Sequence, residues 1–259
     1  MKRLIGIAIV LATFGGLVAA SLLVQTEDAQ AIPAFARKYR MTCNTCHAPA
    51  PKLKAYGDDF AGNGFVLEDQ EAPRYYVETG DENLDLIRDW PIAARFEGYF
   101  QHRTITGKET DFSFPYIVKL LSGGELTKDI SYYFYFYLSE HGEIAGIEDA
   151  YVMFNNIGGS ELDIYVGQFQ VSDPLFKREL RLTFEDYEVY KMGPTASQIP
   201  LAYDRGVMLT YGFETGTDLI LEIINGNGIG ETGENRVYDS DKYKCFVGRA
   251  SQDIGEHVR

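Results

Sequence analysis

The sequence is poor in the residues that usually form metal sites and disulfide frameworks. It contains three Cys and four His among 259 residues. The number of cysteines is odd, so they cannot all pair within the chain as disulfides. Cys43 and Cys46 form one C-x-x-C pair, and a structural zinc site would need a second pair of ligands. The residues left for that role are scattered along the chain: Cys245, His102, His141 and His257. We expect Cys245 to be a small residue within a strand.

Tryptophan and positive charge are also scarce. A single Trp stands against 18 Tyr, 16 Phe and 26 Gly, a composition that favours strands and tight turns over helices. The formal net charge of -14 would repel the phosphate backbone, which excludes nucleic acid as a partner. An acidic surface suits cations and basic soluble proteins instead, or has no meaning for partners at all.

Long apolar segments are missing after the first 24 residues. Lys2 and Arg3 precede an apolar run from Leu4 to Val24, and Ala29-Gln30-Ala31 follows as an A-x-A cleavage site. Residues 1–31 are therefore predicted to be a signal peptide that is cleaved after Ala31. An uncleaved anchor is the alternative, because a run of this length can just span a bilayer. Either interpretation makes the protein an exported one.

One short motif carries the chemistry. Cys43-Asn44-Thr45-Cys46-His47 is a C-x-x-C-H sequence, in which Cys43 and Cys46 would form thioethers to a haem and His47 would ligate its iron. A thioredoxin-like motif would need a βαβ context that the sequence lacks. The motif therefore predicts one covalently bound haem c, and residues 32–88 as a monohaem cytochrome segment.

The flanks of the motif have helical spacing. Residues 32–40 begin with Pro33, a favoured first-turn residue, and place Phe35 and Tyr39 on one face. A second helix is expected to open at Pro51 and to stop at Asn63-Gly64. The apolar residues expected to cover the haem ring are Phe35, Tyr39, Leu53, Tyr56 and Phe60.

The sixth iron ligand is not specified by the sequence. No His or Met lies between His47 and residue 101, so we expect no ligand from residues 48 to 101. Met41 is so close to Cys43 that reaching the opposite face of the ring looks strained. A second ligand would come from the later domain, from another chain, or not exist. The candidates in this chain are His102, His141, Met153, Met192 and Met208.

From about Trp90 the helical spacing gives way to alternation and turn residues. We expect about eight strands of roughly ten residues in an antiparallel up-and-down sheet over residues 89–259. The turns are expected at Gly123-Gly124, Gly158-Gly159 and Asn225 to Gly228. The predicted strands are Pro91–Thr104, Thr110–Leu121, Lys128–Glu140, Gly146–Asn156, Glu161–Gln170, Leu201–Phe213, Thr217–Asn225 and Tyr243–Asp253.

Such a sheet would close into a porin-like, incomplete or truncated β-barrel. Strand length, Tyr and Phe enrichment and the signal peptide favour a barrel in the outer membrane of a Gram-negative-type bacterium. A soluble sandwich or lipocalin-like barrel in the periplasm is the alternative, since it also alternates.

Two stretches resemble known proteins. The first is residues 32–67, in particular AFARKYRMTCNTCHAPAPKLKAYGDDFAGNGF, where the cysteine motif is followed by P-x-L-x-x-Y-G-x-x-F-x-x-N-G-F. It resembles the N-terminal haem segment of the fused outer-membrane cytochrome-porins, whose best-known members oxidise iron in chemolithotrophic bacteria. The resemblance implies a haem at or inside the mouth of a barrel. Only Cys43, Cys46 and His47 carry over as functional positions.

The second stretch, residues 163–249, is similar to phosphate-selective-type porins. The similarity rests on the order of VGQFQVSDPLFKRELRLTFEDYEVY, YDRGVMLTYGF, INGNG and FVGRAS. Porins of this kind have about twice as many strands after the same landmarks.

Electron transfer is the leading functional prediction, with a periplasmic cytochrome or Fe(II) as the redox partner. The alternatives are an Fe(II) oxidase of the outer membrane and a channel with an accessory haem. The sequence has no catalytic constellation beyond the haem motif. A channel would be lined by charged residues, for which the candidates are Arg95, Glu97, Arg178, Arg181 and Arg205.

Overall fold

A computed structural model describes most of the chain after residue 33. The chain divides into two compact units, Met1–Ala31 and Ile32–Arg259, and the described residues belong to the second. They are residues 34–67, 76–78, 85–87, 90–104, 109–127, 129–171, 202–230, 237–239 and 241–254. The signal peptide with its cleavage site, Pro33, Arg178, Arg181, Met192 and His257 lie outside these ranges.

Three short helices lie in the segment predicted to attach haem, which we continue to call the haem segment: α2 (Ala34–Tyr39), α3 (Cys43–Cys46) and α4 (Ala55–Gly62). The helix predicted over residues 32–40 is confirmed for its described part. The helix expected to open at Pro51 begins instead at Ala55, because residues 51–53 run back beside the motif, where Leu53 bridges to His47. The predicted stop at Asn63-Gly64 is confirmed, with Gly64 at a φ of 66°.

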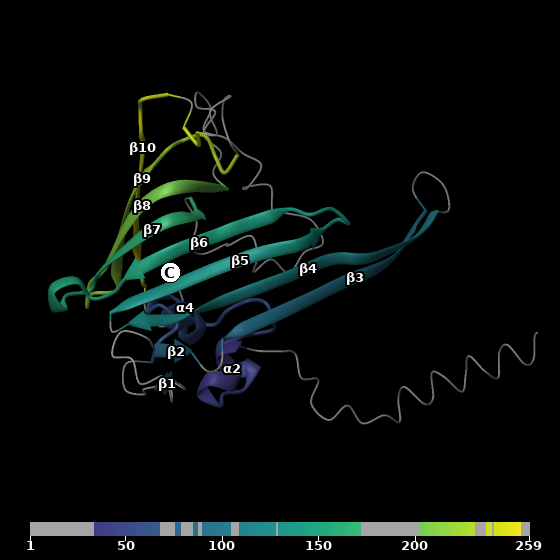
Figure 1. Cartoon of the computed structure of the whole chain (residues 1–259). Helices are drawn as coiled ribbons and strands as arrows, with labels where there is room; N and C mark the ends of the chain where they lie inside the picture. The colour runs from purple at the N-terminus through teal and green to yellow at the C-terminus, as the bar shows by residue number, and fades with distance from the viewer. Residues whose placement is uncertain are drawn as a thin grey trace, which may run out of the picture. The chain divides into compact units, whose positions relative to one another are not determined.

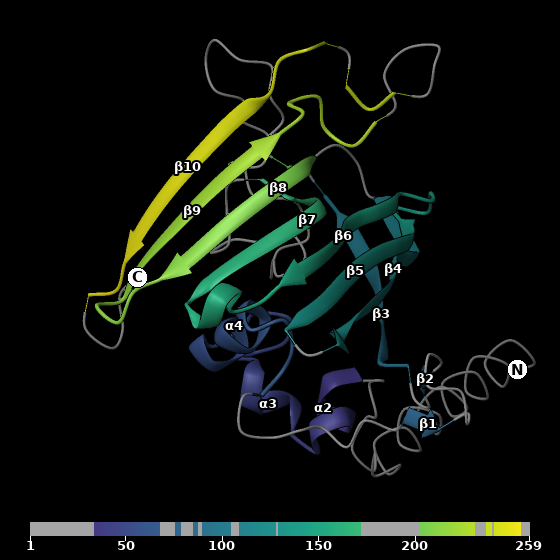
Figure 2. The same cartoon turned by 60° about the vertical axis from the view of Figure 1, so that its left-hand side comes forward.

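Eight strands form one antiparallel sheet in which each strand pairs with its neighbours in sequence (Figures 1 and 2). The mainly β, up-and-down architecture predicted from the sequence is therefore confirmed. The strands are β3 (Ile92–Arg103), β4 (Glu109–Thr127), β5 (Ile130–Glu140), β6 (Gly146–Phe154), β7 (Leu162–Gln170), β8 (Tyr203–Gly212), β9 (Thr217–Ile224) and β10 (Cys245–Gln252). A separate two-stranded sheet, β1 (Tyr76–Glu78) with β2 (Asp85–Ile87), was not expected.

The turn predicted at Gly123-Gly124 is wrong. Both glycines lie inside β4, which continues to Thr127, and the chain reverses where Asp129 takes a φ of 64°. A Cβ at position 123 would lie 2.9 Å from the ring of Phe65 and 3.0 Å from that of Tyr133. Gly123 is therefore needed for a close approach between the haem segment and the sheet, and not for a turn.

One face of the sheet exposes large apolar side chains, whereas the buried face carries tyrosines and charged or polar side chains together with Ile117, Met153 and Phe169. Phe96 in β3 is 72% exposed, while its neighbours Arg95 and Glu97 point to the other side, since successive residues of a strand alternate. In β5 the buried positions are Ser131, Tyr133, Tyr135 and Tyr137. This polarity is the reverse of that of a water-soluble sheet.

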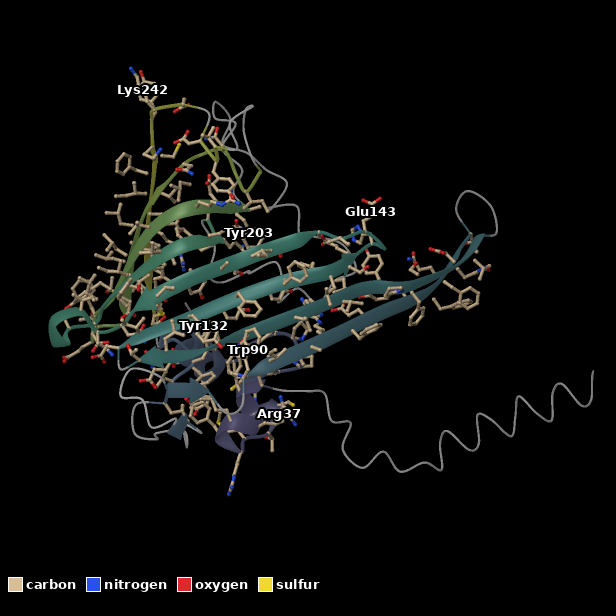
Figure 3. The ribbon with its side chains drawn as sticks, viewed as in Figure 1. Arg37, Trp90, Tyr132, Glu143, Tyr203 and Lys242 are labelled. Carbon is tan, nitrogen blue, oxygen red and sulfur yellow. The ribbon has the colours of Figure 1, made fainter. Side chains whose placement is uncertain are left out.

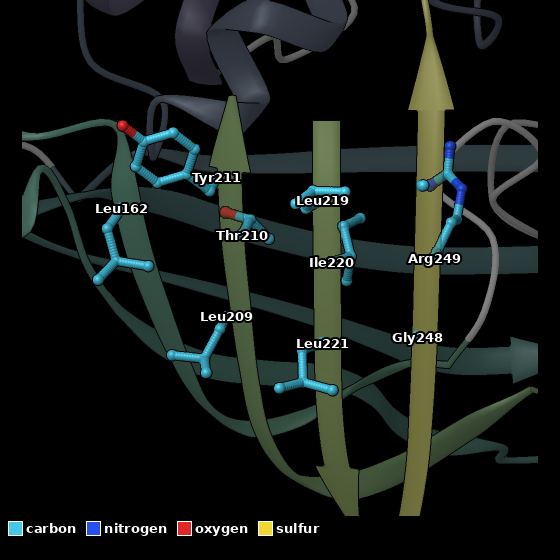
Figure 4. A pocket seen from close by; sticks show the side chains of 10 residues that line it. Leu162, Leu209, Thr210, Tyr211, Leu219, Ile220, Leu221, Gly248 and Arg249 are labelled. Atoms are coloured by element: carbon cyan, nitrogen blue, oxygen red, sulfur yellow. The ribbon is translucent and has the colours of Figure 1, made fainter. Parts of the chain in front are cut away.

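The apolar face is continuous over the last four strands. Figure 4 shows a hollow on it whose apolar lining comes from β7, β8 and β9. The hollow forms where β10 carries Gly248 and Ala250 between larger neighbours. Its leucine and tyrosine members are Leu162, Leu209, Tyr211, Leu219 and Leu221.

The two outer strands of the sheet, β3 and β10, each have one partner in the described part of the chain: β4 and β9. Among the described residues, no helix has the length and apolar character that a membrane crossing requires.

Candidate haem-attachment site

The two motif cysteines lie on one helical turn. The N–H of His47 donates to the carbonyl of Cys43 at 3.0 Å, and this bond closes α3. Residues three apart on a helix lie on the same side, so the two side chains leave one face of the turn. Both thiols are free, with Cys43 exposed and Cys46 half-buried. The turn therefore presents two unpaired sulfurs on one side.

His47 ends this turn with its ring held by the chain. Its backbone is extended, with φ -116° and ψ 149°, and its Nδ1 lies 3.0 Å from the carbonyl oxygen of Pro51. A carbonyl oxygen only accepts, so Nδ1 is the donor in this bond, which leaves Nε2 as the ring nitrogen that could ligate a metal. Metal-bound histidines are usually oriented by such a bond from the second ring nitrogen. His47 is thus prepared to ligate a metal through Nε2.

A tight loop supports this arrangement. The N–H of Lys54 donates to the carbonyl of Cys46 at 2.8 Å, and the N–H of Ala48 donates to the carbonyl of Lys52 at 2.9 Å. On α4, a Cβ at Gly57 would lie 2.5 Å from the carbonyl oxygen of Cys46. Only glycine allows α4 to pack this closely on α3.

Four aromatic rings form the apolar centre of the haem segment. Phe60 meets Phe35 and Tyr39 edge to face, each with its ring centroid at 5.6 Å. Phe35 also stacks on Phe65 at 4.5 Å. The prediction that Phe35 and Tyr39 share a helix face is confirmed, since both contact Phe60. Tyr56 is different, because it is exposed and its hydroxyl lies 3.8 Å from the sulfur of Met41.

The surroundings of Cys46 raise the pKa of its thiol above the ordinary value. Burial raises the pKa of its thiol, the nearby Lys54 ammonium lowers it, and Cys43 raises it, with burial the largest of the three. The two thiols, the free Nε2 and the adjacent aromatic rings together fit the requirements of a c-type haem. Among the described residues, no group of three or more His, Cys, Asp and Glu side chains is placed so that it could hold a metal ion.

The candidates for the sixth ligand lie on different elements. Met153 in β6 is fully buried, and Met208 in β8 packs against the cluster of Phe169, Val171 and Ile224. His102 Nδ1 in β3 lies 3.1 Å from the hydroxyl of Thr110. His141 follows β5 with its ring 4.5 Å from that of Tyr116. Met41, which is not among these candidates, lies in the haem segment, where its sulfur is 3.8 Å from the hydroxyl of Tyr56.

The haem segment docks on the buried, polar face of the sheet. Phe65 stacks on Tyr133 of β5, with ring centroids 5.0 Å apart. A Cβ at Gly64 would lie 2.1 Å from the hydroxyl of Ser131. Arg37 of α2 donates to the carbonyl of Ile92 at 3.2 Å. Sequence reasoning missed Gly64, Gly123, Ser131 and Tyr133 as contact residues. The glycine signal was present but was assigned to turns.

The described residues among those predicted to line a channel lie on two strands, β3 and β8. Arg95 and Glu97 of β3 form an ion pair on the buried face. Arg205 lies at the start of β8, and its guanidinium carbon is 3.8 Å from the centroid of the Tyr238 ring. Arg178 and Arg181 lie outside the described residues.

Comparison with known proteins gives no relative: no family model, no curated protein and no solved structure matches the chain.

Proposed function

We propose that this chain is a monohaem c-type cytochrome that transfers one electron at a time in the envelope of a Gram-negative-type bacterium. The observation that carries the proposal is the local geometry of the motif. Cys43 and Cys46 leave one side of a single turn, and the Pro51 carbonyl orients His47 so that Nε2 is free. When bound, the haem supplies an iron that changes between two oxidation states.

The chain's own residues would hold and orient that group. The thiols of Cys43 and Cys46 would each add across a vinyl group of the haem, with the sulfur bonding one vinyl carbon and the thiol hydrogen going to the other, and His47 would ligate the iron. The bond from His47 Nδ1 to Pro51 fixes the ring plane and increases the basicity of Nε2. Phe35 and Phe60 would exclude water on the side where they pack.

We further propose that the sheet belongs to a porin-like barrel of the outer membrane. Its exposed apolar face and buried polar face support this, because outer-membrane barrels place apolar residues toward lipid and polar ones inside. Closure would join the free edges of β3 and β10, either to each other or through additional strands. The haem segment on the polar face would then lie inside the barrel.

The attachment test uses the exported protein made in cells that mature c-type cytochromes. A haem stain after denaturing electrophoresis should be positive for the wild type and for Cys245→Ser. It should be lost completely in the double variant Cys43→Ser/Cys46→Ser. The proposal is abandoned if the wild type carries no covalent haem.

A second measurement separates electron transfer from iron oxidation. Optical redox titration of the wild type should give one reversible one-electron wave. Rapid reduction on stopped-flow mixing with Fe(II) would support the Fe(II) oxidase, whereas a titratable haem that ignores Fe(II) would support a general electron carrier. His47→Ala should change the haem spectrum while the covalent attachment remains.

A further inference from the structure

Residues 34–67, the part of the haem segment that surrounds the motif, have the opposite charge to the whole chain, whereas residues 68–88 add seven acidic and two basic residues. The whole sequence has a net charge of -14, yet basic residues dominate around the motif. Between residues 34 and 67 the charged side chains are Arg37, Lys38, Arg40, Lys52, Lys54, Asp58 and Asp59. The local excess is therefore positive in a strongly acidic protein.

Two of these cations face the sheet. Arg37 donates to the carbonyl of Ile92 in β3. The Nζ of Lys38 lies 3.3 Å from the Cβ position of Gly124 in β4 and 5.0 Å from the ring centroid of Tyr39. Both therefore contact the sheet, although the Arg37 side chain is itself exposed.

The other three cations are exposed beside the motif: Arg40, Lys52 and Lys54. Lys52 and Lys54 flank Leu53, which bridges to His47, so in this extended stretch they project on the side opposite Leu53. The ammonium of Lys54 reaches the carbonyl of Asn44 inside the Cys43–Cys46 turn. Within the described residues, none of the three forms an ion pair. We call these three residues the cationic rim.

The surface next to the cationic rim is small and uncharged. Thr42, Cys43 and Asn44 are exposed, as are Ala48, Pro49 and Ala50. The nearest acidic group with an exposed side chain in the segment is Asp59, on α4. A partner approaching the Cys43 edge of the motif would therefore meet positive charge and little steric obstruction.

We propose that the cationic rim docks an acidic redox protein, which exchanges electrons with the haem at the Cys43 edge. This inference rests on the proposed function and names the partner of that site. It reverses the expectation from net charge, which favours basic partners. Charges are screened over about 10 Å at 0.1 M salt, so the groups near the contact decide the docking and distant carboxylates do not.

The test measures reduction of the haem-loaded, full-length protein in detergent by a reduced, strongly acidic [2Fe–2S] ferredoxin. The cluster loses one electron and the haem iron gains one, with no bond made or broken. The rate for the wild type should fall as salt is raised. In Arg40→Glu/Lys52→Glu/Lys54→Glu the rate at low salt should fall by about tenfold or more, the range of electrostatic steering.

The single variants provide a matched comparison. Lys52→Glu alone should slow the reaction by about two- to threefold, as one of three steering charges. Lys242→Glu makes the same charge change at an exposed lysine far from Arg37 and the haem segment (Figure 3). It should leave the rate unchanged.

Hexaammineruthenium(II), a small cation, serves as the second reductant. It should reduce the triple variant at least as fast as the wild type, which shows that the haem is intact. Equal ferredoxin rates in the two proteins, each reducible by ruthenium, would overturn the docking proposal alone. A wild-type protein with no covalent haem would overturn the proposed function and this inference with it.

Discussion

The haem segment buries its large apolar side chains, whereas the sheet exposes many of its own on one face. In the haem segment Phe60 is buried while Lys52 and Lys54 are exposed, as in any protein folded in water. In the sheet Phe96 is exposed, while Lys119 and Tyr135 are buried. One chain therefore follows two rules of burial. The proposed membrane barrel would account for the second rule, because lipid would then cover the apolar face of the sheet.

The largest expected effect comes from placing a charge on the apolar face. Leu221 in β9 and Tyr56 in the haem segment are both 44% exposed. In phospholipid vesicles Leu221→Arg should lower the free energy of unfolding by up to about 4 kcal/mol, the cost of arginine at mid-membrane on the lipid face of a barrel. Tyr56→Arg should change it by less than about 0.5 kcal/mol, as at an ordinary surface. Urea unfolding followed by circular dichroism measures both.

Similar small changes in the two variants would contradict the two-rule interpretation and make the sheet an ordinary soluble one. A large loss of unfolding free energy in Tyr56→Arg would also contradict it, because Tyr56 would then not behave as an ordinary surface residue.

The next largest effect is the loss of stability when a buried carboxylate of the sheet is removed, compared with the loss at an exposed carboxylate of the haem segment. Asp204 in β8 is fully buried. Its Oδ2 accepts from the N–H of Gly226 at 2.8 Å and of Gly228 at 3.1 Å. Asp204→Ala should cost about 2 to 3 kcal/mol, because buried donors lose a charged acceptor. Asp59→Ala, on the exposed side of α4, should cost less than about 0.5 kcal/mol.

Urea midpoints of the two alanine variants give this comparison directly. Equal losses would mean that Asp204 is not anchoring the loop that follows β9.

The contact between the two regions is tested at Gly64. Its φ is 66°, and a Cβ would meet the Ser131 hydroxyl at 2.1 Å. Gly64→Ala should cost about 2 kcal/mol, since an L-residue at this φ costs about 1 to 2 kcal/mol before any displacement of Ser131. Adding Ser131→Gly should recover only part of the steric cost, because Asn155 Nδ2 would still lie 2.8 Å from that Cβ, and it should leave the backbone cost.

Gly62 is the matched control two residues earlier. It lies within α4, and nothing is within 4 Å of its Cβ position. Gly62→Ala should therefore stabilise the protein by up to about 1 kcal/mol through helix propensity. Destabilisation of both variants to the same extent would show that the cost at Gly64 is not specific to docking.

Sequence reasoning succeeded where the signal is local and periodic. All eight strands of the sheet were found, since alternation and turn residues mark them, and β9 was predicted to within one residue. The helix start at Pro51 failed for a local reason as well, because proline suits a loop carbonyl that accepts from His47 as much as a first helical turn.

What could not be predicted is how distant segments meet. Gly123 and Gly64 have no sequence signal that distinguishes a turn from a close approach, and only Phe65 and Ser131 show why they are glycines. Alternation in Tyr132 to Tyr137 indicates which residues share a face. It does not say which face is buried, because Tyr and Phe suit both sides of a strand.

The smallest effect concerns Asp239, which lies between β9 and β10. We expect its ion pair to behave as an ordinary pair exposed to water. Asp239 accepts from the Lys244 ammonium, from the N–H of Asp241 and from Asn227, and these bonds lower its pKa, with the Lys244 bond the largest cause. A depressed pKa means that ionised Asp239 stabilises the fold above its unfolded value of 3.8. That stability is lost as the pH falls through the folded pKa.

Asp239→Asn should therefore have a slightly lower Tm than wild type at pH 7, and the difference should disappear at acidic pH. High salt should reduce it, since exposed pairs are screened, whereas the loss in Leu221→Arg should persist in salt because lipid contact does not depend on ionic strength. A Tm difference between Asp239→Asn and wild type that does not change with salt would contradict this, because an exposed ion pair in water is screened.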